Sequence, residues 1–154
     1  MSDLARDFAR IMGRDLQKLR QELEAYASDA DVWRVAGEAK NSAGTLALHL
    51  VGNLDHFVGA VLGESGYVRD REAEFGVRDV ARDELLRRVD ACRGRVVSTL
   101  EGLSDAALHL PYPGKLPPQF QGASTHLFLL HLAVHLDWHL GQMSYHRRML
   151  TAAG

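Results

Sequence analysis

The sequence predicts an all-α protein built as a four-helix bundle, and three observations support this prediction. All four prolines lie within residues 111–118, so the strongest helix breaker is missing elsewhere. Apolar residues recur at the three- and four-residue spacing of amphipathic helices in four long segments. No segment alternates apolar and polar residues in the manner of a strand. The length of 154 residues fits one domain over residues 1–154.

Two of the expected helices are amphipathic, with one apolar stripe each. The first covers residues 2–26, with Ser2 or Asp3 as its N-cap. The third covers residues 81–103 and places the only cysteine, Cys92, on its buried stripe. A single cysteine excludes an internal disulfide and a metal or redox site of the Cys-x-x-Cys type.

The other two expected helices are almost free of charge. The second covers residues 41–62, with Asn41 as N-cap, and the fourth covers residues 124–149. Over most of their length each carries a single charged residue, Asp55 and Asp137 respectively. Because such helices have no solvated face, we expect protein to cover most of their surface.

The connections and the overall charge limit the possible partners. The segments 64–79 and 104–122 are long for a compact bundle, and long loops are often functional. The net charge of −2 gives no reason to expect nucleic acid or an anionic membrane as partner. No apolar leader or membrane-length segment is evident, so a cytoplasmic location is expected.

Histidine is the residue type that indicates chemistry. The chain has eight histidines, and four of them lie between residues 126 and 139. His131, His135 and His139 follow one another at intervals of four, which places them on one face of the fourth helix. Two imidazoles at this spacing can bind one metal ion at about 2.0–2.1 Å, as in zinc-binding His-x3-His pairs.

A third ligand is expected from the second helix, because two histidines hold a metal ion poorly. His49 and His56 both lie there, seven residues apart and near the same face, so the spacing leaves both possible. The His-x3-His pair lacks the glutamate of HExxH proteases, and no Glu-x-x-His motif of diiron bundles occurs. Nucleophile motifs and phosphate-binding glycine loops are also missing.

Three stretches of the chain resemble a known family. Residues 130–143, with His-x3-His-x-Gly-Gln, resemble the signature of the DinB/YfiT superfamily. Residues 48–54 are similar to the second-helix segment of that family, whose histidine is the first metal ligand. Residues 69–75 are similar to the Arg-rich connection, ending in Glu-Phe, of an uncharacterised DinB-like branch.

The resemblance implies an up-down-down-up bundle, usually a homodimer, with one divalent metal ion held by three histidines. Carried over position by position, these ligands are His49, His135 and His139. The resemblance therefore favours His49 over His56, and it leaves His131 beside the triad.

Three neutral imidazoles would leave the ion with an open position and its full charge, which is typical of catalytic sites. Such an ion, with zinc or nickel expected, can activate either a bound water or a bound thiol. Characterised members of the family include thiol-dependent S-transferases and an isomerase. The resemblance thus implies a thiol-cofactor-dependent transferase or isomerase acting on a small molecule. The alternatives are a metal-dependent hydrolase that uses a metal-bound water and a non-catalytic, stress-related metal-binding bundle.

The side chains expected around the metal ion are less firmly indicated. Asn53, one turn after His49, and Tyr145 are candidate catalytic residues. Arg69 and Arg71 could bind a carboxylate of a low-molecular-weight thiol, although the acidic residues beside them are alternative partners. Gly141 suggests a close approach of another helix, and Gln142 could orient His139.

Overall fold

The computed structural model describes residues 2–153 and confirms the all-α prediction. Four long helices make up the bundle, and no strand forms within these residues. The long helices are α1 (Asp3–Ala25), α3 (Ala43–Leu54), α5 (Arg82–Glu101) and α7 (Thr125–Ala153). The shorter ones are α2 (Asp29–Val32), the π-helix η1 (Asp55–Ala60), α4 (Arg71–Gly76), α6 (Asp105–His109) and the 3-10 helix η2 (Pro118–Phe120).

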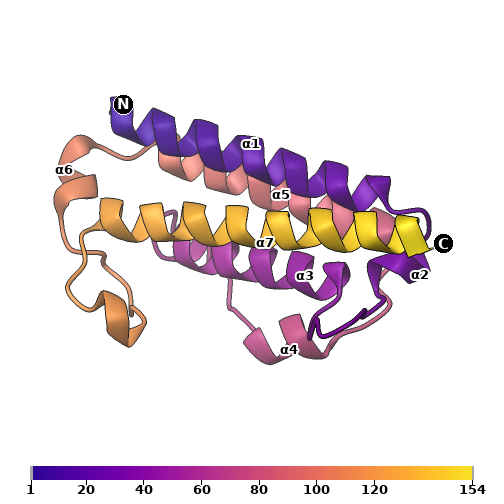
Figure 1. Cartoon of the computed structure of the whole chain (residues 1–154). Helices are drawn as coiled ribbons and strands as arrows, with labels where there is room; N and C mark the ends of the chain where they lie inside the picture. Colours follow the sequence, from indigo (N-terminus) through magenta and orange to yellow (C-terminus); the bar gives the residue numbers. More distant parts are fainter. Residues whose placement is uncertain (1, 154) are drawn as a thin grey trace.

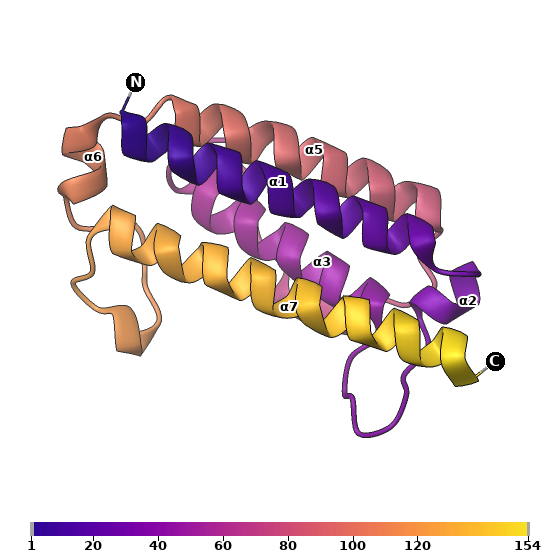
Figure 2. The same ribbon diagram turned by 45° about the horizontal axis from the view of Figure 1, so that its top comes forward.

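The directions of the long helices give the up-down-down-up order. Helices α1 and α7 begin at one end of the bundle, and α3 and α5 begin at the other (Figure 1). Helix α1 packs against α5 and α7, and α3 packs against the same two helices from the opposite side (Figure 2). The histidine-bearing helices α3 and α7 are therefore direct neighbours.

Helix α3 is buried on every side, as its lack of charge predicts. All twelve of its residues are buried, and its apolar side chains enter the common core with those of the other long helices. The one charge that follows it, Asp55, pairs with Arg95 of α5 through both carboxylate oxygens, at 2.9 and 2.7 Å. This bidentate pair compensates a carboxylate that is almost completely buried.

The start and the end of the second expected helix differ from the prediction. The N-cap is Ser42 rather than Asn41, because the Ser42 hydroxyl accepts from the backbone N–H of Thr45 and the helix begins at Ala43. After Leu54 the helix continues as the π-helix η1 instead of ending as regular α-helix near residue 62. At the start of α1, the predicted cap Ser2 is confirmed, since its hydroxyl accepts from the N–H of Ala5.

Both long connections contain short helices. In the segment 64–79, the Asp70 carboxylate caps α4 by accepting from the N–H of Ala73. In the segment 104–122, the Ser104 hydroxyl caps α6 in the same way. Among the residues described, no helix has the length and apolar character needed to cross a membrane.

The packing predicts a large cost for removing a core side chain. Leu16 of α1 is fully buried, whereas Val68 in the connection before α4 is 86% exposed. We expect Leu16→Ala to lower the free energy of unfolding by about 2–5 kcal/mol, because it leaves a cavity. Val68→Ala, as control, is expected to change it by about 0.5 kcal/mol or less. Urea unfolding of both variants checks this, and equal losses would contradict the described core.

Candidate metal centre

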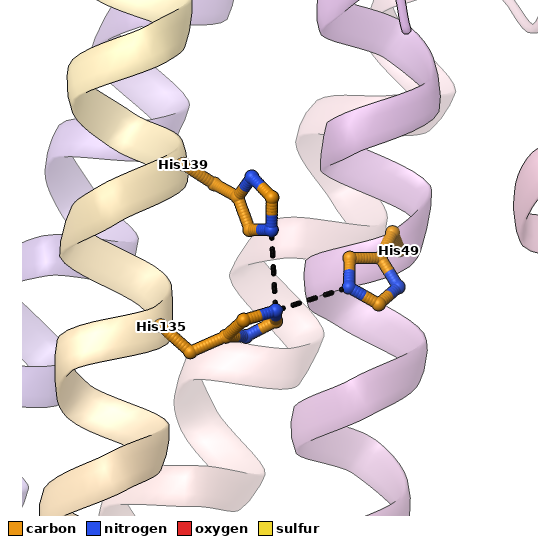
Figure 3. Close-up of side chains that lie close together, drawn as sticks. All are labelled: His49, His135 and His139. Atoms are coloured by element: carbon orange, nitrogen blue, oxygen red, sulfur yellow. Dashed lines mark hydrogen bonds between the residues drawn. The ribbon is translucent and has the colours of Figure 1, made fainter. Parts of the chain in front are cut away.

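Three histidine side chains converge between α3 and α7. His135 and His139 lie one turn apart on α7 and point toward His49 of α3 (Figure 3). The Nε2 atom of His135 lies 3.2 Å from that of His49 and 3.1 Å from that of His139. One ring nitrogen of each residue lies within 4.8 Å of the others, so together they could hold a metal ion.

Hydrogen bonds on the far side of two rings determine which nitrogen faces the centre. The Nδ1–H of His49 donates to Oε1 of Glu74 at 3.1 Å, since a carboxylate can only accept. The Nδ1–H of His139 donates to Oε1 of Gln142 at 2.7 Å. In neutral imidazoles this leaves the Nε2 of both rings as unprotonated acceptors that point inward.

His135, between them, cannot satisfy both neighbours. Its Nε2–H could donate to only one of the two acceptors, and its Nδ1 is buried without a hydrogen-bond partner among residues 2–153. With the proton on Nδ1 instead, three lone pairs face one another. A cation at the centre resolves this conflict, because it accepts all three lone pairs. Nitrogen ligands of a metal ion at about 2.0–2.1 Å lie roughly 3 Å apart, close to the spacing observed.

Burial favours the neutral form of the two imidazoles on α7, His135 and His139. Burial, together with the smaller effects of the neighbouring rings of His139 and His49, lowers the pKa of His135 from 6.5 to about 3. Burial also lowers the pKa of His139, against the opposing effect of its hydrogen bond to Gln142. Neutral imidazole is the form that binds a metal ion, so near neutral pH a metal ion does not have to displace a proton from the rings of His135 and His139.

Glu74 is a site residue that sequence reasoning identified only as a possible partner of the arginines. It comes from α4, is 5% exposed, and bonds Arg69 as well as His49. The Nε of Arg69 donates to Oε2 at 2.8 Å, and its Nη2 donates to Oε1 at 2.9 Å. Burial raises the pKa of Glu74, but the bonds from His49 and Arg69 outweigh it and leave that pKa below its usual value.

The family comparison agrees with this geometry. The family model described as the DinB superfamily matches residues 13–143, a range that includes all three histidines. The chain belongs to the DinB superfamily. This confirms the resemblance seen in the sequence. A comparison with curated proteins finds no match.

The other two histidines considered as site residues lie beside the triad. His131 continues the ladder on α7, with its ring 6.1 Å from that of His135 and 4.3 Å from that of Phe120. His56 lies in η1 against Phe57, outside the cluster. Burial lowers the pKa of both residues, and for His56 nearby Arg69 adds to the effect.

The predicted catalytic residues occupy different surroundings. Asn53 is buried, and its Oδ1 has no hydrogen-bond partner within the described chain, whereas Glu74, not Asn53, bonds the second nitrogen of His49. Tyr145 is 66% exposed on the surface of α7. Gln142 does orient His139.

Two further expectations concern a glycine and an arginine near the site. Gly141 is exposed, and no part of the described chain approaches within 4 Å of the position its Cβ would take, so the expected close helix contact is wrong for this chain alone. Arg71 is exposed, and its guanidinium lies 5.1 Å from the centre of the Phe75 ring, which itself packs 4.9 Å from His49.

The lowered pKa of His135 predicts how the metal-free protein responds to acid. Below pH 6.5 the unfolded chain takes up a proton at this residue, whereas the folded chain does so only near pH 3. Stability is therefore lost as the pH falls from 6.5 toward 3. We expect His135→Gln to flatten this part of the profile of unfolding free energy against pH. Parallel profiles for variant and wild type, measured with a chelator present, would contradict the assignment.

Proposed function

We propose that His49, His135 and His139 bind one divalent metal ion and that the protein is a metal-dependent enzyme using a low-molecular-weight thiol. The observation that supports this most directly is the convergence of three Nε2 atoms, two of them fixed as acceptors by Glu74 and Gln142. The reaction proposed is an S-transfer or an isomerisation of a small electrophilic substrate.

The metal ion supplies one element of the chemistry. If His49, His135 and His139 hold a divalent ion, the ion would keep an open position and would lower the pKa of a thiol bound there. The half-buried ring of His131 lies next to this site, with its centre 6.1 Å from that of the His135 ring.

The buried carboxylates near the site form ion pairs with arginines, and this favours a thiol over water as the nucleophile. A free carboxylate could assist a metal-bound water as general base, and Glu74 and Asp55 are two buried carboxylates of the described chain. Both are already bonded to arginine, Glu74 to Arg69 and Asp55 to Arg95. A thiol is more acidic than water and depends less on such a base. Hydrolysis therefore remains the second candidate.

The thiol has to come from outside the chain. The only cysteine, Cys92, is buried in α5 and its Sγ lies 3.9 Å from the carbonyl oxygen of Val51. Burial raises the pKa of this thiol well above its ordinary value, so it stays protonated and unreactive. For the carboxylates of a small thiol, Arg71 is the better partner, because Arg69 already binds Glu74 through two nitrogens.

Thiol dependence tests this function. We expect protein loaded with zinc or nickel to conjugate or isomerise reactive electrophiles only when a low-molecular-weight thiol is present. His135→Ala should lose this activity, and His109→Ala, outside the site, should keep it. Product formation with water alone would favour the hydrolase, and metal binding without turnover in any assay would favour a non-catalytic bundle.

We also propose that the protein is a homodimer that pairs through the outer surface of α7. Asp137 and Arg148 are exposed on α7, but large apolar side chains are also exposed along this helix at helical spacing. They are Leu127, Leu130, Val134, Trp138, Tyr145 and Met149. A second copy can match this stripe of apolar side chains across a two-fold axis, with each residue used twice.

Sedimentation analysis tests the dimer. Val134 and Val68 are both exposed valines, at 67% and 86%, but only Val134 lies on the apolar stripe. We expect Val134→Glu to give a monomer and Val68→Glu to keep the wild-type mass, since a buried unpaired charge opposes association. A wild-type monomer, or a dimer that both variants retain, would contradict this interface.

A further inference from the structure

The connection between η1 and α5 contains α4, and its residues 69–75 contribute two groups to the histidine on α3. Glu74 accepts the Nδ1–H of His49, and the ring of Phe75 packs 4.9 Å from the ring of His49. Asp70 caps α4, which fixes the orientation of the helix turn that carries both residues. This segment thus contacts the one proposed ligand that does not come from α7.

Both oxygens of Glu74 are held. Oε1 binds His49 and Nη2 of Arg69, and Oε2 binds Nε of the same arginine. The Arg69 guanidinium lies 5.7 Å from the centre of the Phe57 ring and is itself only 15% exposed. The carboxylate therefore has little freedom to rotate away from His49.

Gly52 gives this carboxylate the room it occupies. A Cβ on Gly52, three residues after His49, would lie 2.2 Å from Oε2 and 2.6 Å from Cδ of Glu74. These distances are far below van der Waals contact, so any other residue at position 52 displaces the carboxylate. The missing side chain allows Glu74 to lie against the backbone of α3, within reach of His49.

We infer that Glu74 is a positioning residue for the metal centre, with Arg69 and Gly52 holding it in place. It fixes the tautomer and the ring orientation of His49, so that the Nε2 lone pair points toward His135 and His139. The inference rests on the proposed metal site. Carboxylates that bind the outer nitrogen of a ligating histidine typically change metal affinity by about 10- to 100-fold.

The test combines three variants with two measurements. Gly52→Ala displaces the carboxylate, Glu74→Ala removes it, and Glu74→Gln keeps an acceptor oxygen without the charge. Gly94→Ala is the matched control, because it is also a helical glycine and has no neighbour within 4 Å of its Cβ position. Zinc affinity is measured by competition with a chromophoric chelator. The tautomer of His49 is measured by ¹⁵N NMR of the imidazole rings in metal-free protein.

We expect Gly52→Ala and Glu74→Ala to weaken zinc binding by about 10- to 100-fold and to abolish the preference of His49 for the Nδ1–H form. Glu74→Gln should keep that tautomer while binding zinc more weakly, and Gly94→Ala should match the wild type in both. An unchanged tautomer in folded Glu74→Ala would overturn the inference, as would wild-type zinc affinity in Glu74→Gln. If the wild type binds no zinc, the proposed function fails, but the tautomer measurement still decides the role of Glu74.

Discussion

The Nε2 atom of His135 faces the Nε2 atoms of His49 and His139 at 3.2 and 3.1 Å, and the rest of the proposed site is built around this contact. Each of the three atoms is an acceptor, or has at most one proton to share, so they cannot satisfy one another by hydrogen bonding. The outer nitrogens of His49 and His139 are bound to side-chain oxygens, which keeps the inner lone pairs free. A positive ion between the three is the simplest compensation, and the proposed chemistry depends on it.

The bundle supplies the conditions for this arrangement. Because α3 is buried on all sides, His49 is held in one position, and its neighbours keep the site poorly solvated. Low solvation favours neutral imidazole and so preserves the form that binds a cation. The segment before α5 then adds the carboxylate of Glu74, whose charge is balanced by Arg69 rather than by solvent.

How much of this could be predicted depends on how local each feature is. The pair His135 and His139 follows from helical spacing alone, and so it could be identified from the sequence. The choice between His49 and His56 could not be made from spacing, because seven residues place both near the same face of a regular helix, and the π-helix that begins at Asp55 was not predicted. The family resemblance favoured His49, which is the residue found in the cluster.

Features that depend on tertiary packing were not predictable in the same way. Glu74 lies 25 residues from His49, in a short helix within what the sequence indicated as a loop. The glycine at position 52 gave no signal either, since its role is visible only once Glu74 lies against it. The cap at Ser42 rather than Asn41 shows the same limit on a small scale, because neighbouring polar residues can both cap a helix.

The metal content of untagged protein is the most direct measurement of the central claim. The wild type, the double variant His135→Ala/His139→Ala and the control His109→Ala/His126→Ala would be compared after reconstitution with zinc or nickel. The control changes two neighbouring histidines, with rings 6.0 Å apart, that are not part of the cluster. We predict close to one bound ion per chain in the wild type and control, and none in the first variant. Equal metal content in both double variants would contradict the three-histidine site.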